Sequence, residues 1–178
     1  MNLTEYNAIP AGNNKRAVRL AITRTDALAN FRYDDGKLYW LRAPSKNTPS
    51  GTEAGTLRVD GYRRILFRYK RHYTHRLIYL MHHGEFDGEI DHIDCDKSNN
   101  KIENLRLATR GENTRNIKIP RDNTSGAKGV SFTSGKYRAK IKVNNKQIHL
   151  GSFNSMHEAS QVYAAASKKY HGEFGRLQ

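Results

Sequence analysis

The residues best suited to do chemistry lie in the middle of the chain. An aspartate and a histidine are adjacent there, and two asparagines follow 12 and 21 residues after the histidine: Asp91, His92, Asn104 and Asn113. A histidine can accept a proton near neutral pH because its ordinary pKa lies close to that value. Carboxylate and amide oxygens are ligands that a hard divalent cation prefers. A base and a cation together suit the hydrolysis of a phosphodiester, which needs a positioned water and neutralisation of developing charge.

Two strands and a helix are predicted around these residues. Asp91 and His92 end one short strand, a long polar loop follows, and Leu105–Ala108 has the pattern of a second strand. A helix is expected to begin near Thr109. In that order, side chains from a strand and from a helix can converge on one point.

The stretch from 75 to 117 resembles the HNH endonuclease family, whose core is the ββα-metal motif. The resemblance is carried by the segments HRLIYLMHHGEF, DHID, SNNKIENLRLAT and ENTRN. The spacing of the two asparagines is similar to the homing-endonuclease branch, with asparagine in place of the final histidine.

The resemblance implies a role for each residue. It implies that His92 is the general base that deprotonates the attacking water. Asp91 and Asn113 would hold one divalent metal ion, Mg²⁺ or Mn²⁺, with water and phosphate oxygens completing its shell. Asn104 would orient the His92 ring, and Asn100 would brace the loop.

Each of these residues also has an ordinary explanation. Taken singly, His92 would be a common strand histidine, and Asn104 and Asn113 would be turn or helix-cap residues. Their spacing, the loop composition and the second strand together favour the catalytic interpretation. Cys95 departs from the family, which usually has glycine there, and pays a backbone cost if its φ is positive. We interpret this lone cysteine as a loop residue and not as a metal ligand.

The C-terminal part has the clearest alternation. Tyr137–Val143 places apolar residues on one side and basic residues on the other. Strands are also expected over Val130–Thr133 and Gln147–Phe153, with a turn at Asn144-Asn145. Ser155 is expected to cap a helix over residues 156–170. Three strands and one helix are enough for a small two-layer domain.

Residues 125–177 resemble the AP2 DNA-binding domain. The matching segments are SGAKGVSF, GKYRAKIKV and IHLGSFNSMHEASQVYAAASKKYHGEFGRL. The resemblance implies a three-stranded sheet on one helix, with the sheet lying in the major groove of double-stranded DNA. The expected DNA-binding residues are the outward basic row: Lys136, Arg138, Lys140 and Lys142. Arg138 is the expected guanine contact and the lysines are expected to contact phosphates; the alternative is a solvated lysine face.

Base readout cannot be transferred from the plant members of that family. Ser131, Thr133 and His149 stand at positions where those proteins use arginine or tryptophan to contact bases. The target sequence therefore does not follow from the resemblance.

The N-terminal residues 1–74 are predicted to form a β-rich region that could also contact DNA. Asp35-Gly36 and Asp60-Gly61 are turn signals between apolar runs, and they predict two hairpins. Thr25 is the expected N-cap of a short helix over Asp26–Asn30.

The predicted fold class is α+β, with four parts along the chain. After the β-rich region come an HNH core over residues 75–117, a polar linker over 118–124 and an AP2-like domain over 125–178. Inside the HNH core, Thr74 is the expected N-cap of a helix over His75–His83.

Composition limits the possible classes of protein. The 178 residues include 31 Lys and Arg against 17 Asp and Glu, a net charge of +14 that fits a polyanionic partner. No apolar run could cross a membrane, and no secretory signal is visible, so a cytoplasmic location is expected. One cysteine excludes a disulfide framework. From Glu85 to Asp96 there are six acids and no base, which is either a solvated acidic loop or the approach to a cation site.

The sequence thus predicts a phage-type homing endonuclease that cuts double-stranded DNA. It would use one divalent metal and no small-molecule cofactor, and it would act as a monomer or homodimer. One HNH site cuts one strand, so a monomer would nick. The alternatives are a DNA-binding regulator with an inactive HNH core and an RNA-binding protein that uses the same basic surface.

Overall fold

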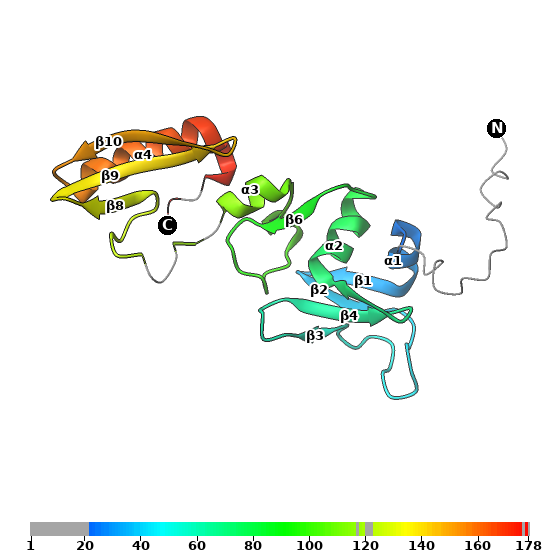
Figure 1. Ribbon diagram of the computed structural model, residues 1–178. Helices are drawn as coiled ribbons and strands as arrows, with labels where there is room; N and C mark the ends of the chain where they lie inside the picture. Colours follow the sequence, from blue (N-terminus) through cyan, green and yellow to red (C-terminus); the bar gives the residue numbers. More distant parts are fainter. Residues whose placement is uncertain (1–21, 117, 120–122, 176, 178) are drawn as a thin grey trace, which may run out of the picture.

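The computed structural model describes residues 22–116, 118–119, 123–175 and 177 (Figure 1). Within this part of the chain, four α-helices accompany two two-stranded and two three-stranded antiparallel sheets, which confirms the α+β fold class. Residues 1–21 and part of the predicted linker, at 120–122, lie outside the described residues. Among the helices that are described, none has the length and apolar character needed to cross a membrane.

The first elements are α1 (Arg24–Asn30), β1 (Phe31–Asp34) and β2 (Lys37–Trp40). The turn between the strands has Asp35 at φ 43° and Gly36 at φ 83°, as the Asp-Gly signal predicted. The cap prediction was wrong: the N-cap of α1 is Thr23, and Thr25 lies inside the helix. Asp26 lies three residues after Thr23, so the two side chains bond each other's backbone N–H groups in a capping box.

The second sheet contains one strand more than was predicted. Its order is β3 (Thr56–Leu57), β4 (Arg63–Phe67) and β5 (Lys70–Tyr73). β5 was missed because Arg68 and Tyr69 form the turn before it at φ 49° and 62° without glycine, asparagine or aspartate.

The segment that resembles HNH nucleases follows directly. It contains α2 (Thr74–His83), β6 (Glu89–His92), a 3₁₀ turn η1 (Ile102–Asn104), β7 (Leu105–Ala108) and α3 (Arg110–Arg115). β6 and β7 pair antiparallel. Helix α3 begins next to Thr109, as predicted, and Thr109 caps it in a capping box with Glu112. Thr74 does not cap α2: it is the first helical residue and is fully buried, and Tyr73 occupies the cap position.

A single hydrophobic core joins the β-rich region to this segment. Its members come from α1, β1, β2, β4, α2, β6 and β7, and they include Phe31, Leu38, Ile65, Ile78 and Leu105. The sheets of the first part therefore pack directly on α2, β6 and β7 of the segment that contains the predicted catalytic residues.

The C-terminal part has its own small core. It contains β8 (Val130–Thr133), β9 (Lys136–Val143), β10 (Lys146–Phe153), α4 (Met156–His171) and a 3₁₀ turn η2 (Gly172–Phe174). The sheet order is β10-β9-β8, and α4 lies across one face of it (Figure 1). Small residues such as Ala139 and Ala159 allow the helix to approach the sheet closely. The three strands and one helix are those that the alternation predicted, and Ser155 caps α4.

Candidate active site

His92 lies at the end of β6 with its side chain buried, only 4% exposed. Its Nε2 is 3.0 Å from Oδ1 of Asn100, a second buried side chain, which comes from the loop between β6 and β7. An amide oxygen only accepts, so this contact places the ring proton on Nε2 and leaves Nδ1 as the basic atom. The ring is thus held in one orientation and one tautomer.

The contact that the resemblance assigned to Asn104 is made by Asn100 instead. Asn104, at the end of η1, accepts from the Asp94 N–H at 3.0 Å and donates to Asp94 Oδ1 at 2.9 Å. It also donates to the Asn99 carbonyl at 2.8 Å. With its amide committed to these loop atoms, Asn104 positions the loop, while Asn100 contacts the ring.

Asp91 is buried, 5% exposed, and its charge is compensated inside the protein. Arg106 of β7 places Nη2 2.9 Å and Nε 3.0 Å from Asp91 Oδ2. Asn116, which follows α3, donates its amide to both carboxylate oxygens at 3.0 and 3.2 Å and to the His92 carbonyl at 2.8 Å. These contacts explain how a carboxylate can be buried here.

Asn113 faces β6 from α3 and shares a cavity with Asp91 and His92. Its Nδ2 donates to Glu89 Oε2 at 2.5 Å. The cavity has a volume of about 350 Å³ and is lined by Tyr62, Ile90, Asp91, His92, Cys95, Lys97, Asn113, Asn116 and Lys118. The structure thus brings together the predicted base and both predicted metal ligands, while Asn100 and Asn104 do not line the cavity.

The oxygen donors in this cavity fit a hard divalent cation. Asp91 offers a carboxylate, Asn113 offers an amide, and Glu89 is one hydrogen bond away. Arg106 already pairs with Asp91, so a cation there would share that carboxylate with the guanidinium. Within the described residues, no group of three or more His, Cys, Asp and Glu side chains is arranged as a metal site.

Two aromatic residues beside His92 were not singled out from the sequence. The His75 ring of α2 packs edge-on to the His92 ring at 4.9 Å, and the Tyr62 ring lies 6.0 Å from it. Burial, and then the neighbouring His92 and Arg76, lowers the pKa of His75 to about 3. Burial also raises the pKa of Tyr62. Both side chains are therefore neutral near pH 7.

Asn116 and Arg106 were also missed, although one signal was available. Asn116 is three residues after Asn113, so the two lie on the same face of a helix turn. Arg106 follows the buried Leu105 in β7, but only the pairing register places it opposite Asp91.

The loop between β6 and β7 is held in shape by its own polar groups. Burial raises the pKa of Asp94, but hydrogen bonds from the Asp96 N–H, Asn99 and Asn104 together lower it below the ordinary value. Cys95 has φ 61°, a left-handed backbone conformation that favours glycine, and its Sγ donates to the Asn116 carbonyl. The loop thus bonds to the end of α3 beside the cavity.

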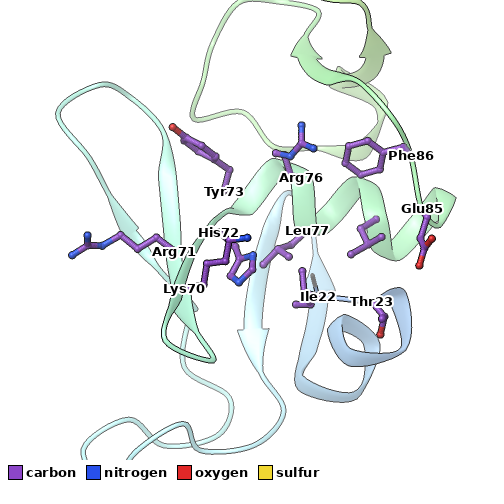
Figure 2. A pocket seen from close by; sticks show the side chains of 11 residues that line it. Ile22, Thr23, Lys70, Arg71, His72, Tyr73, Arg76, Leu77, Glu85 and Phe86 are labelled. Atoms are coloured by element: carbon purple, nitrogen blue, oxygen red, sulfur yellow. The ribbon is translucent and has the colours of Figure 1, made fainter. Parts of the chain in front are cut away.

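A second and larger cavity, of about 440 Å³, lies between the residues that precede α1, strand β5 and helix α2 (Figure 2). Arg76 lies over the Phe86 ring at 4.8 Å and donates to the Gly88 carbonyl at 3.0 Å. The other lining residues are Ile22, Thr23, Lys70, Arg71, His72, Tyr73, Leu77, Leu80 and Glu85. None of the predicted catalytic or metal-binding residues lines it, whereas Asp91, His92 and Asn113 line the smaller cavity.

The predicted DNA-binding row lies on the sheet face opposite α4. Along β9, Ala139 and Ile141 are buried against the helix, and the four basic side chains alternate with them: Lys136, Arg138, Lys140 and Lys142. The register pairs Arg138 with Ser131 and Ser152, and Lys140 with His149. The row is therefore flanked by polar neighbours, and among the described residues none of its four members forms an ion pair.

The end of the tail touches the back of the active site. Arg106, the partner of Asp91, also donates from Nη1 to the Glu173 carbonyl at 3.0 Å. Its guanidinium lies 3.9 Å from the centre of the Phe174 ring. Arg106 thus contacts both Phe174 of η2 and the buried carboxylate of Asp91.

Comparisons with known proteins identify a family for the segment that carries the site. The model of the HNH endonuclease family matches residues 72–115. Protein 3.8 of Escherichia phage T7 is 35% identical over 91 residues, which cover 50% of this chain and 74% of that protein. An uncharacterized HNH endonuclease of Acanthamoeba polyphaga mimivirus is 34% identical over 104 residues, which cover 56% of this chain and 54% of that protein.

Two other proteins are similar over different extents. An ethylene-responsive transcription factor-like protein of Arabidopsis thaliana is 48% identical over 40 residues, 22% of this chain and 18% of that protein. The solved structure of the HNH homing endonuclease I-HmuI aligns with a TM-score of 0.40 and 21% identity, over 80% of this chain and 85% of that one.

The family match falls on the segment that carries the cavity, and the phage relative is covered over most of its length. The chain belongs to the HNH endonuclease family and is a nuclease.

Proposed function

We propose that this nuclease hydrolyses phosphodiester bonds in double-stranded DNA with one divalent metal ion, as a homing-type endonuclease, and nicks one strand per active site. The observation that carries the proposal is the cavity in which Asp91, His92 and Asn113 lie together. A buried base beside oxygen ligands is the arrangement that metal-assisted hydrolysis of a phosphodiester requires.

In this proposal His92 accepts the proton of the attacking water at Nδ1. The hydrogen bond between its Nε2 and Asn100 fixes the ring, which is what a general base needs to act on a positioned water. Asp91 and Asn113 would hold Mg²⁺ or Mn²⁺, which, when bound, would stabilise negative charge on the phosphate and leaving oxygen.

The AP2-like tail would target the nuclease to its site. The basic row on β9 (Lys136, Arg138, Lys140 and Lys142) and its polar neighbours form one face of a short sheet that has the size to enter a major groove. The similarity to a plant transcription factor-like protein also supports this role. Lys136 donates to Asn154 and is expected to be a peripheral phosphate contact.

A plasmid-nicking assay tests the proposed function. The wild-type protein is expected to convert supercoiled plasmid to the open circle with Mg²⁺ and to stop with EDTA. His92→Ala is expected to lose the nicking activity by a factor of about 10² or more while it still binds DNA. His83→Ala, which changes an exposed histidine of α2, serves as the matched control.

Two results would count against the proposal. Full nicking by His92→Ala would remove His92 as the base. Binding without nicking by the wild-type protein would instead favour the DNA-binding regulator, and preference for duplex RNA at fixed salt would favour an RNA-binding role.

A further inference from the structure

Lys97 belongs to the loop between β6 and β7 and lines the cavity of Asp91, His92 and Asn113. Its Nζ donates to the Asp60 carbonyl at 3.3 Å. It also lies 4.7 Å from the centre of the Tyr62 ring, in a cation–π contact. The two contacts come from the turn before β4, so the N-terminal sheet holds a side chain of the nuclease loop.

These contacts orient the ammonium group and leave its charge uncompensated. Among the described residues Lys97 forms no ion pair with a carboxylate, whereas Lys101 in the same loop pairs with Asp35 at 2.8 Å. The carbonyl oxygen accepts one of the three N–H donors of the ammonium group. The aromatic ring attracts the positive charge but does not accept a full hydrogen bond from the other two. Donors therefore remain for an anion at the cavity.

The stem of this side chain lies beside the turn at Gly61. A Cβ added to Gly61 would lie 3.5 Å from Cβ and Cδ of Lys97. The hydrogen bond to Asp60 and the contact with the Tyr62 ring restrict the side chain, which reduces the rotamer entropy that a lysine loses when it binds a ligand.

We propose that Lys97 binds a non-bridging oxygen of a DNA phosphate at the His92 cavity, and that Tyr62 is its positioning residue. The inference rests on the proposed function and adds a substrate-binding group to it. The Asp91 charge is already compensated by Arg106, so a further cation in this cavity serves an incoming anion. A phosphate held there would present its phosphorus to the water activated by His92.

Single-turnover nicking at saturating DNA with Mg²⁺ tests the role of Lys97. Lys97→Ala is expected to lower the nicking rate by about 10- to 100-fold, the scale at which removal of one charge-stabilising donor acts. DNA affinity measured with EDTA is expected to fall by less than about 3-fold, because one phosphate contact among many is lost. Lys97→Arg should recover part of the rate, and Lys101→Ala is the matched control that should nick as the wild type does.

A double-mutant cycle tests the role of Tyr62. Tyr62→Phe keeps the ring face and is expected to retain the rate, while Tyr62→Leu removes the face and should lower it towards that of Lys97→Ala. If Tyr62 acts through Lys97, the double variant will be no slower than Lys97→Ala alone. Thermal unfolding of each variant separates this effect from loss of the fold.

The outcomes are distinguishable. A Lys97→Ala variant that nicks at the wild-type rate overturns the inference and leaves the proposed function intact. Fully additive losses in the cycle overturn the positioning role of Tyr62. A wild-type protein that does not nick overturns the proposed function, and the inference fails with it.

Discussion

At the scale of single residues, the contacts of Asn100 and Asn104 show which of the two holds the His92 ring and which holds the loop. The sequence alone did not distinguish these roles. Asn100 contacts the His92 ring, and Asn104 bonds to Asp94 and Asn99 within the loop. Spacing along the chain identifies both as polar loop residues, but the path of the loop decides which amide reaches the ring. That path depends on a distant contact, because Ile102 N donates to the hydroxyl of Tyr33 at 3.1 Å.

Substitution of the two asparagines by alanine should therefore give different losses. Asn100→Ala removes the hydrogen bond to His92 and is expected to slow single-turnover nicking by about 10- to 100-fold. Asn104→Ala is expected mainly to lower the free energy of unfolding, by about 1–3 kcal/mol, because Asp94 loses two bonds. The reverse pattern, with a slow but stable Asn104→Ala, would restore the role that the family resemblance implies.

The buried His75 predicts a specific loss of stability in acid. Its pKa is about 3 in the folded protein and about 6.5 when unfolded. Between these values the unfolded chain binds a proton that the folded chain excludes. The free energy of unfolding should thus fall as pH drops below 6.5, by at most about 1.4 kcal/mol per pH unit from this residue.

Urea unfolding at several pH values measures this contribution. His75→Gln should unfold with a shallower pH dependence than the wild type between pH 6.5 and 4, whereas His83→Gln on the same helix should retain the wild-type slope. Identical slopes for His75→Gln and the wild type would show that His75 already binds its proton in the folded protein.

At the scale of elements, much of the fold follows from local sequence. The alternation in β9, the Asn-Asn turn with φ 48° and 63°, and the capping box at Thr109 act over a few residues and were predictable. β5 was not predicted, because Arg68 and Tyr69 are poor turn formers that adopt positive φ only when neighbouring strands pair. The catalytic residues of the cavity could be predicted as a set, but not the wall at Tyr62 or the packing of His75 on His92, which come from distant elements.

Gly129, next to the start of β8, lies where the chain packs closely against α4. Its φ is 70°, and an added Cβ would lie 2.0 Å from the ring of the buried Tyr163 on α4. Gly126 has nearly the same φ, 73°, with open space around it. Gly126→Ala should therefore cost about 1 kcal/mol from backbone strain, and Gly129→Ala about 1–3 kcal/mol more from overpacking.

Chemical denaturation of both glycine variants provides the comparison. If the two variants lose the same stability, Tyr163 must move at no cost, and the close approach of β8 to α4 is not a constraint on the tail.

At the scale of the whole molecule, charge and contacts link the tail to the nuclease. After Asn123 the chain has nine Lys and Arg against two acids, so the tail carries a large part of the positive charge. The same tail reaches the active site through Phe174 and Arg106. The end of the tail and the Asp91 carboxylate thus contact the same guanidinium.

Loss of the Phe174 ring should affect cleavage more than binding. Phe174→Ala removes a cation–π contact worth about 0.5–2 kcal/mol and leaves Arg106 less restrained against Asp91. Nicking is expected to slow by about 2- to 10-fold at unchanged DNA affinity, whereas Leu177→Ala, an exposed residue nearby, should have no effect. Equal nicking rates for the two variants would show that the contact does not reach the active site.

The core shared by the first two parts of the chain has an evolutionary consequence. Phe31, Leu38 and Ile65 fill the space beneath α2 and β6, so the nuclease motif cannot be cut out of this chain as a self-sufficient piece. Recombination that moved residues 72–115 alone into another protein would transfer the catalytic residues without the core residues on which their helix and strands pack. A transferable unit of cleavage would therefore have to include the sheets that precede the motif. The C-terminal part has a separate core, but an exchange of that part would also have to replace the contacts that Glu173 and Phe174 make with Arg106.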